Sequence, residues 1–305
     1  MVATMTDIQE AKARKVQAAA ALTIAMFFWG TSAVFLRTTA LTLAPENALA
    51  LRYLALVPLL AMGLLITGQW RIAQADWPRL MVTALAGMFG SAWFTMQGFA
   101  RVAAGLGTVI QMVEPIIIAF LAFALIREPL SKRLWAGLGI SIAGGIVLFW
   151  PDLSAAAQQP VDPWGVAALL SASTCWAIYT IGAKPLLPRY SGFTITAWSS
   201  LIAAPLIFLL ASKPYGELFA TTPTTSWLEI LYLAVFNSIV GNVLWTYGTR
   251  HLPGASVGSF LYLMPVFAVA AGFLWLGEAI TAYLIGGGLI VLAGVALAQS
   301  GSKGH

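Results

Sequence analysis

The last apolar stretch of the chain is largely a second copy of a segment that lies 150 residues earlier. Residues 254–299 read GASVGSFLYLMPVFAVAAGFLWLGEAITAYLIGGGLIVLAGVALAQ, and residues 104–150 read AGLGTVIQMVEPIIIAFLAFALIREPLSKRLWAGLGISIAGGIVLFW. Each copy contains an apolar helix with a proline near its middle, Pro115 or Pro265, then a glutamate at its end, and then an apolar helix that carries glycines. Two copies of one unit predict two related halves.

The repeat extends upstream with a shift of 147 residues. FFWGTSAVFLR (27–37) aligns with TCWAIYTIGAK (174–184), which places Trp29 on Trp176. Each half then holds five apolar spans, and an odd number of spans turns the second half upside down relative to the first. Inverted repeats of this kind are typical of secondary transporters, which bind their substrates near the midplane between the halves.

Composition places these spans in a membrane. The 305 residues are 60% hydrophobic and only 9% charged, a balance that one soluble core cannot hide. A membrane-spanning helix needs about 20 apolar residues, and ten runs approach this length: 16–37, 46–68, 79–100, 105–126, 133–150, 163–184, 192–212, 227–249, 256–276 and 281–299. The sequence therefore predicts an all-α integral membrane protein with ten transmembrane helices, arranged as two inverted five-helix repeats around a central cavity.

The positions of Lys and Arg predict the orientation, because cytoplasmic loops retain positive charge. With the N-terminus inside, twelve of the 16 Lys and Arg residues fall in inner segments. The expected organisation is a cytoplasmic N-terminal tail (1–15), a first repeat (16–150), an outer linker (151–162), a second repeat (163–299) and a cytoplasmic C-terminal tail (300–305). The net charge of +5 reflects this topology and predicts no nucleic-acid partner.

The motifs EPIIIAFLAFALIREPL…GLGISIAGG and MPVFAVAAGFLWLGEAI…GGGLIVLAGVAL resemble the ten-span branch of the drug/metabolite transporter superfamily, from about residue 16 to 299. The resemblance implies a monomeric or loosely associated exporter in a bacterial inner membrane, with a small-molecule substrate such as an amino acid, including aromatic ones. A multidrug or other metabolite exporter is the alternative within this fold, and a structural or sensory membrane protein is the alternative outside transport. The superfamily's short members carry a coupling glutamate in their first helix; LTIAMFFWGTSAVFLR has none, so uniport and proton antiport both stay open.

Polar groups at membrane depth should face a cavity, because lipid offers them no hydrogen bonds. Amide side chains are less easily satisfied within their own helix than Ser or Thr, so cavity lining and packing are equally open for Gln97, Gln111, Asn237 and Asn242. The aromatic candidates are Trp29, Trp93, Trp176, Tyr179 and Tyr262. As repeat mates, Trp29 and Trp176 would offer an apolar substrate two flat walls and two N–H donors; close helix packing explains them equally well.

Arg52 and Glu114 are the two ionisable acid or base residues that fall well inside predicted spans. A charge in hydrocarbon costs at least a few kcal/mol unless it faces a partner or water. The two side chains are therefore expected at the cavity wall. They either pair with each other and hold two spans together, or are separated by water or substrate, in which case Arg52 can receive a carboxylate and Glu114 an ammonium group or a proton.

The prolines and small residues predict motion and packing. Pro115 and Pro265 each remove a backbone hydrogen bond near mid-span and are expected to act as hinges. Glycine stripes predict close packing for the fifth and tenth spans, outside the cavity. Ser131 and Thr281 follow Glu128 and Glu278, and each can cap the next helix; gating or ion coupling by the glutamates is the alternative.

Metal-protease and phosphate-loop motifs are missing from the sequence. Neither His251 nor His305 lies at membrane depth, and neither an HExxH nor a GxxxxGK[ST] pattern occurs. The sequence therefore predicts a protein that is not an enzyme and that needs no metal ion or other cofactor.

Overall fold

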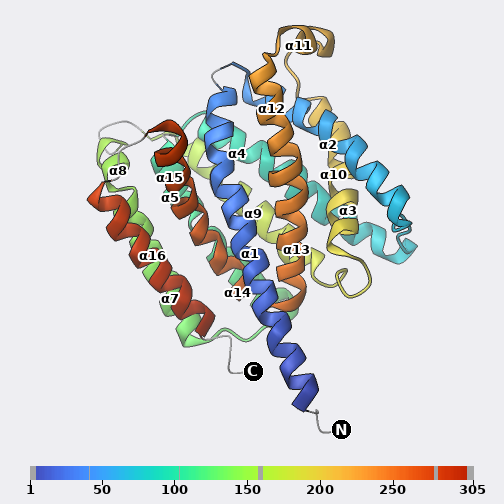
Figure 1. The fold of residues 1–305 in the computed structure, drawn as a ribbon. Coiled ribbons are helices and arrows are strands. Elements are labelled where there is room, and N and C mark those ends of the chain that lie inside the picture. Colours follow the sequence, from blue (N-terminus) through green and yellow to red (C-terminus); the bar gives the residue numbers. More distant parts are fainter. Residues whose placement is uncertain (1–4, 41, 103, 157–160, 278–280, 301–305) are drawn as a thin grey trace.

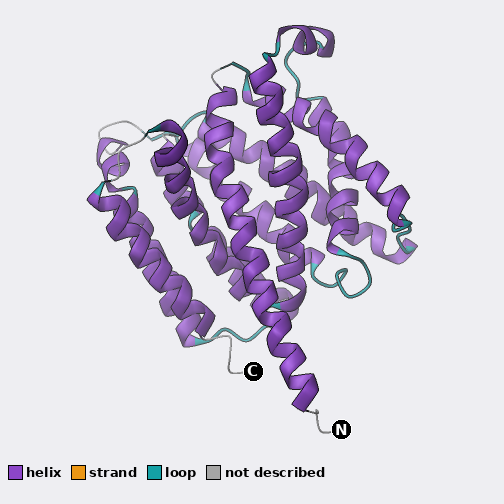
Figure 2. Cartoon of the chain, in the orientation of Figure 1, coloured by secondary structure: helices purple, strands orange, loops and turns teal. Residues whose placement is uncertain are grey.

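The computed structural model describes residues 5–40, 42–102, 104–156, 161–277 and 281–300. Within these ranges the chain forms helices and connecting turns, and Figure 2 shows no strand among them. The helices pack side by side into one bundle (Figure 1). We call the end of the bundle where α1 begins and α16 ends the base, and the end that carries the short helices α8 and α11 the top.

The first half contains five helical rods. Three of them are single helices, namely α1 (Met5–Ala40), α2 (Pro45–Thr67) and α7 (Lys132–Leu148), with the short α8 (Trp150–Ala156) after α7. The other two are composite: η1 (Gln74–Asp76) leads into α3 (Trp77–Ala84), η2 (Leu85–Gly90) and α4 (Ser91–Phe99), and α5 (Ala104–Gln111) is followed by α6 (Glu114–Ile126).

The second half follows the same order. It consists of α9 (Pro163–Ala183), α10 (Gly192–Phe208), the short α11 (Tyr215–Thr221), α12 (Thr224–Tyr232) continued by η3 (Leu233–Gly241) and α13 (Asn242–His251), α14 (Gly254–Ser259) continued by η4 (Phe260–Tyr262) and α15 (Leu263–Leu276), and α16 (Ala282–Ser300). The elements η2 and η3 are π-helical.

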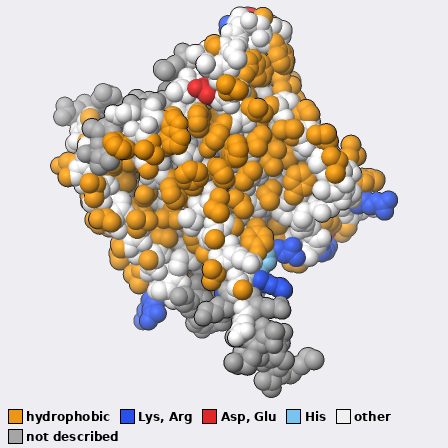
Figure 3. Space-filling view, viewed as in Figure 1, with side chains coloured by type: hydrophobic (Ala, Val, Ile, Leu, Met, Phe, Trp, Pro, Cys, Tyr) orange, Lys and Arg blue, Asp and Glu red, His pale blue; other side chains and the backbone are white. Residues whose placement is uncertain are grey.

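Seven helical stretches among the described residues are long and apolar enough to cross a membrane. They are Ala13–Leu36, Pro45–Thr67, Leu106–Ile126, Pro163–Ala183, Thr224–His251, Gly254–Trp275 and Ala282–Ser300; Gly192–Phe208 is a shorter apolar helix. On the face drawn in Figure 3, hydrophobic side chains cover the middle, and Lys and Arg gather toward the base. The protein is therefore a multi-pass membrane protein.

Three boundaries differ from the sequence prediction. Helix α1 begins at Met5, so the polar segment that leads to Lys15 is helical and continues the first span. The segment expected as an outer linker begins with helix α8, and the chain forms helix α11 after the seventh predicted span. These short helices were missed because a single helical turn or two carries little periodicity to detect.

Repeat mates contact each other in three places, which locates an approximate two-fold axis between the halves. Tyr262 Oη donates to the carbonyl of its mate Met112 at 2.9 Å, and Ser141 Oγ donates to the carbonyl of its mate Val291 at 3.4 Å. The rings of Trp29 and Trp176 lie 5.4 Å apart. Equivalent residues can touch only near the axis that relates them, so the axis passes through the middle of the bundle.

Helices α7 and α16 pack closely and antiparallel around this axis. A Cβ added at Gly137 would lie 2.5 Å from the backbone nitrogen of Ala298, and one added at Gly144 would lie 2.6 Å from that of Val291. Gly294 is equally close to Ser141. The predicted glycine stripes are therefore packing surfaces, except that Gly145 faces Met112 and that Gly286 and Gly288 have open space beside them.

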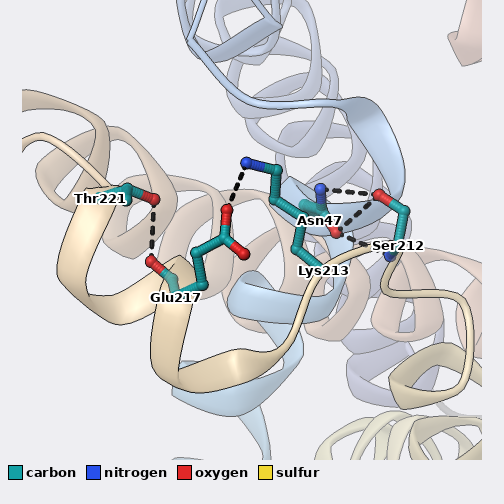
Figure 4. Close-up of polar contacts among 5 residues, drawn as sticks. All are labelled: Asn47, Ser212, Lys213, Glu217 and Thr221. Carbon is teal, nitrogen blue, oxygen red and sulfur yellow. Dashed lines mark hydrogen bonds and ion pairs between the residues drawn. The ribbon is translucent and has the colours of Figure 1, made fainter.

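Polar contacts at the top fix the beginning of α2 against the end of α10 (Figure 4). Asn47 Oδ1 accepts from the backbone N–H of Ser212 at 2.9 Å, and its amide donates to Ser212 Oγ at 3.0 Å. Lys213, just before α11, and Glu217 of α11 form a half-exposed ion pair with 2.6 Å between Nζ and Oε1. Asn47 is buried, so its two bonds replace the water that the folded chain excludes.

Candidate substrate cavity

A cavity of about 670 Å³ lies between the two halves. Its wall is built by residues of α1, α2, η2, α4, α5, α6, α9, α10, η3, α13, η4 and α15. The lining runs from mid-bundle residues such as Trp176 and Asn242 to Leu36, Phe99 and Phe149 near the top. No residue at the base of the bundle appears among those that line it, so the cavity extends toward the top only.

Both predicted intramembrane charges line this cavity. Arg52 comes from α2 and Glu114 is the first residue of α6. Among the ion pairs of the described residues, none joins Arg52 to Glu114, and Arg52 Nε is buried without a hydrogen-bond partner. Both charges therefore line one cavity without the direct ion pair of the first sequence-based alternative.

Four tryptophan and tyrosine rings form an aromatic cluster at the inner end of the cavity. Trp176 lies 5.4 Å from Trp29, 6.0 Å from Trp245 and 5.2 Å from Tyr179, measured between ring centroids. Trp29 and Trp176 line the cavity, whereas Trp245 and Tyr179 are completely buried behind them. Tyr179 packs against the backbone of Gly87, where a Cβ would lie 2.4 Å away.

The amide candidates separate into two groups. Gln111, Asn237 and Asn242 line the cavity. Asn242 donates to the carbonyl of Ser238 at 2.8 Å, while its Oδ1 has no partner among the described residues. Gln97 lies outside the lining and accepts from Arg101 at 2.8 Å. Trp93, one helical turn away on α4, is half-buried and also lies outside the lining.

The cavity wall contains two helix breaks, one in each half. Helix α5 ends at Gln111 and α6 begins at Glu114, with Pro115 in its first turn. The equivalent position in the second half is η4, which ends at Tyr262. Tyr262 lines the cavity and satisfies the carbonyl of Met112 in the first break. Pro115 and Pro265, the two predicted hinges, both line the cavity at these positions.

The π-helical segments were missed by the sequence analysis. η2 and η3 occupy equivalent places in the two halves, and Gly87 of η2 and Asn237 of η3, which are repeat mates, both line the cavity. A π-helical turn shifts the backbone hydrogen bonds by one residue and is frequent at functional sites. The only sequence signal for these π-helical segments is the presence of small residues, such as Gly241 beneath Trp29, which let an aromatic ring lie against the backbone.

The base of the bundle is closed by a polar cluster that includes Glu128. This carboxylate pairs with Lys184 of the α9 end and accepts from the backbone N–H of Gly254 at 2.5 Å; Lys184 also donates to the carbonyl of Leu252 at 3.1 Å. Gly254 in turn packs against Ala122 of α6. Glu128 thus ties three helix ends together, and we call this group the base latch.

The predicted caps are confirmed, one beside this cluster at the start of α7 and the other at the start of α16. Ser131 Oγ accepts from the backbone N–H of Leu134 at 3.1 Å, and Thr281 Oγ1 accepts from that of Leu284 at 3.2 Å. Glu278, the mate of Glu128, lies outside the described residues.

Two antiparallel halves that enclose a cavity lined by aromatic and charged groups within an apolar bundle define a membrane transporter. The family follows from the sequence match: the model of the EamA-like transporter family matches residues 17–150 and 163–299, one match for each half. The chain belongs to this family, which is part of the drug/metabolite transporter superfamily.

Named relatives carry transporter descriptions. A "Probable terminal-alkyne amino-acid exporter" of Streptantibioticus cattleyicolor is 29% identical over 78% of this chain and 78% of its own length. The "Uncharacterized inner membrane transporter YedA" of Escherichia coli (strain K12) is 28% identical over 80% of this chain and 78% of its own. One crystal structure superposes with a TM-score of 0.78 at 20% identity, covering 94% of this chain and 97% of that one; this likeness shows the fold.

Proposed function

We propose that this protein is a secondary transporter that exports amino acids across the bacterial inner membrane by alternating access. In this proposal all ten helical rods cross the membrane, both termini are cytoplasmic, and the top of the bundle faces outward. The charge distribution along the sequence supports the orientation, and the relative named as an inner membrane transporter supports the location.

One observation carries the substrate class: Arg52 and Glu114 line the same cavity without pairing with each other. Burying two separated charges is costly unless a ligand or water compensates each of them. A zwitterionic amino acid does this, because its carboxylate suits Arg52 and its ammonium group suits Glu114. The relative named as an amino-acid exporter points to the same class.

The structure also supports the direction of access that this function requires. The cavity extends to the top, while the base latch and the packing of Gly254 on Ala122 close the base. With the top outside, this is the state that releases substrate to the exterior. Loading from the cytoplasm then requires the base to open, and we propose that the helix breaks at Pro115 and Pro265 absorb that movement.

Flux through purified protein tests this function. The chain is reconstituted into liposomes and assayed with each of the twenty radiolabelled amino acids, with and without a pH gradient. Saturable flux of at least one amino acid is expected, and it should fall in Arg52→Gln. Flux of lipophilic cations in place of amino acids would instead assign a drug exporter, and dependence on the pH gradient would separate proton antiport from uniport.

A further inference from the structure

The two mid-membrane tryptophans are repeat mates, but their indole N–H groups have different surroundings. Trp29 Nε1 donates to the carbonyl of Asn237 in η3 at 3.0 Å. Trp176 Nε1 is buried and has no hydrogen-bond partner among the described residues, although its ring lines the cavity. A buried donor without a partner is costly, so such a group calls for a ligand or an ordered water.

The residues around the two indoles differ between the halves. Trp29 can reach the η3 backbone because residue 241 is glycine: a Cβ there would lie 2.2 Å from Trp29 Nε1. The mate of Gly241 is Ser91, which has a Cβ. Gly87 against Tyr179 and Gly90 against Cys175 set the antiparallel register of α9 on the third rod, and this register puts Trp176 level with Ser91. The position level with Trp176 therefore carries a Cβ, whereas the equivalent position beside Trp29 does not.

Trp176 shares the cavity with two other unpartnered polar atoms. Arg52 Nε is a second buried donor, and Asn242 Oδ1 is a buried acceptor. Both residues line the cavity together with Trp176. The unsatisfied groups thus offer two donors, one of them charged, and one acceptor, and this set is complementary to a carboxylate beside an ammonium group.

We infer that Trp176, together with Arg52, forms the carboxylate subsite of the substrate cavity, whereas Trp29 is a structural brace of η3. Asn242 Oδ1 accepts from the ammonium group of the same ligand. The inference rests on the proposed amino acid transport for the identity of the natural substrate, but the subsite itself requires only a carboxylate. The duplicated indole has thus taken two roles, and residues 91 and 241 decide which copy faces the ligand.

Three probes separate the groups of the ligand: L-phenylalanine, phenylalaninamide, which lacks the carboxylate, and 3-phenylpropanoate, which lacks the ammonium group. Equilibrium binding of each is measured to the full chain in lipid nanodiscs. Wild type should prefer phenylalanine to its amide. In Trp176→Phe the affinities for phenylalanine and 3-phenylpropanoate should fall by about tenfold or more, because a bond to a charged group is lost, and the affinity for the amide should change little.

Trp29→Phe is the matched control, because it removes the same N–H from the mate. It should lower the melting temperature more than Trp176→Phe does, and it should leave more of the carboxylate preference intact. Ser91→Gly and Ser91→Ala form a second matched pair. Only the glycine variant frees the space in which Trp176 can dock on η2, so it should lose more carboxylate affinity than the alanine variant.

The outcomes separate the subsite from the function. If both tryptophan variants lose the carboxylate preference to the same degree, or if neither loses it, the subsite is overturned. The proposed amino acid transport is not affected by that result. Binding of 3-phenylpropanoate that depends on Trp176, without flux of any amino acid, keeps the subsite and overturns the proposed function. A wild-type protein that binds neither carboxylate probe overturns the subsite outright.

Discussion

Neutralising the base latch should open the base of the bundle. Glu128 and Lys184 are 17% and 19% exposed, and the carboxylate also accepts the Gly254 N–H. Glu128→Gln keeps the size of the side chain and one acceptor oxygen, but it removes the charge from both interactions. A hydrogen bond to a charged group contributes about 1.5–3 kcal/mol. The free energy that favours the closed base over the open base should therefore fall by roughly 1–3 kcal/mol. The population of the closed base relative to the open base should then fall about 5- to 150-fold.

Thiol labelling measures this shift. Ala122 is fully buried against Gly254 at the base, so a cysteine placed there in a Cys175→Ser background reacts with a maleimide only when the base opens. The labelling rate should rise about tenfold with Glu128→Gln. Lys184→Met should act in the same direction, because it removes the other charge.

An ion pair at the top of the bundle provides a matched control. Lys213 and Glu217 form an ion pair at the start of α11, and their side chains are 52% and 45% exposed. Exposed pairs contribute about 0–1 kcal/mol, so Glu217→Gln should leave the labelling rate at residue 122 unchanged. An unchanged rate in Glu128→Gln, or an equal rise in Glu217→Gln, would refute the latch.

Three further predictions concern the cavity and the packing around the axis. Arg52→Gln and Glu114→Gln should each reduce amino acid flux about tenfold and the double variant by the product, because no ion pair links them; a double variant that transports better than either single one would show that they pair. Gly137→Ala should lower the melting temperature, since its Cβ would lie 2.5 Å from the Ala298 backbone and overpacking costs about 1–3 kcal/mol. Gly139→Ala on the same helix has open space and should be neutral or stabilising; equal losses would contradict this account. Tyr262→Phe should destabilise the fold by about 1–3 kcal/mol in a denaturation assay, since it leaves a buried carbonyl unsatisfied, and a wild-type melting temperature would argue against it.

Much of the architecture was predictable from the sequence because lipid imposes simple rules. Apolar runs of span length had to be helices, since lipid leaves backbone groups no other partner. The repeated prolines and glutamates indicated two related halves, and the mate contacts Met112–Tyr262 and Ser141–Val291 agree with that prediction. The helix caps at Ser131 and Thr281 were also predictable, since a cap depends on residues three positions apart.

The roles of individual polar residues depended on the tertiary structure. Gln97 and Gln111 look alike in the sequence, but only Gln111 lines the cavity, because the direction of a side chain depends on how its helix is rotated against its neighbours. The partners of Glu128 come from segments 56 and 126 residues away. The π-helical segments and the docking of Trp29 on Gly241 are likewise contacts across the bundle. The sequence by itself determined which groups the membrane would bury, because burial follows from local hydropathy; which of those groups remain unsatisfied and face the cavity was decided by packing between helices distant in the chain.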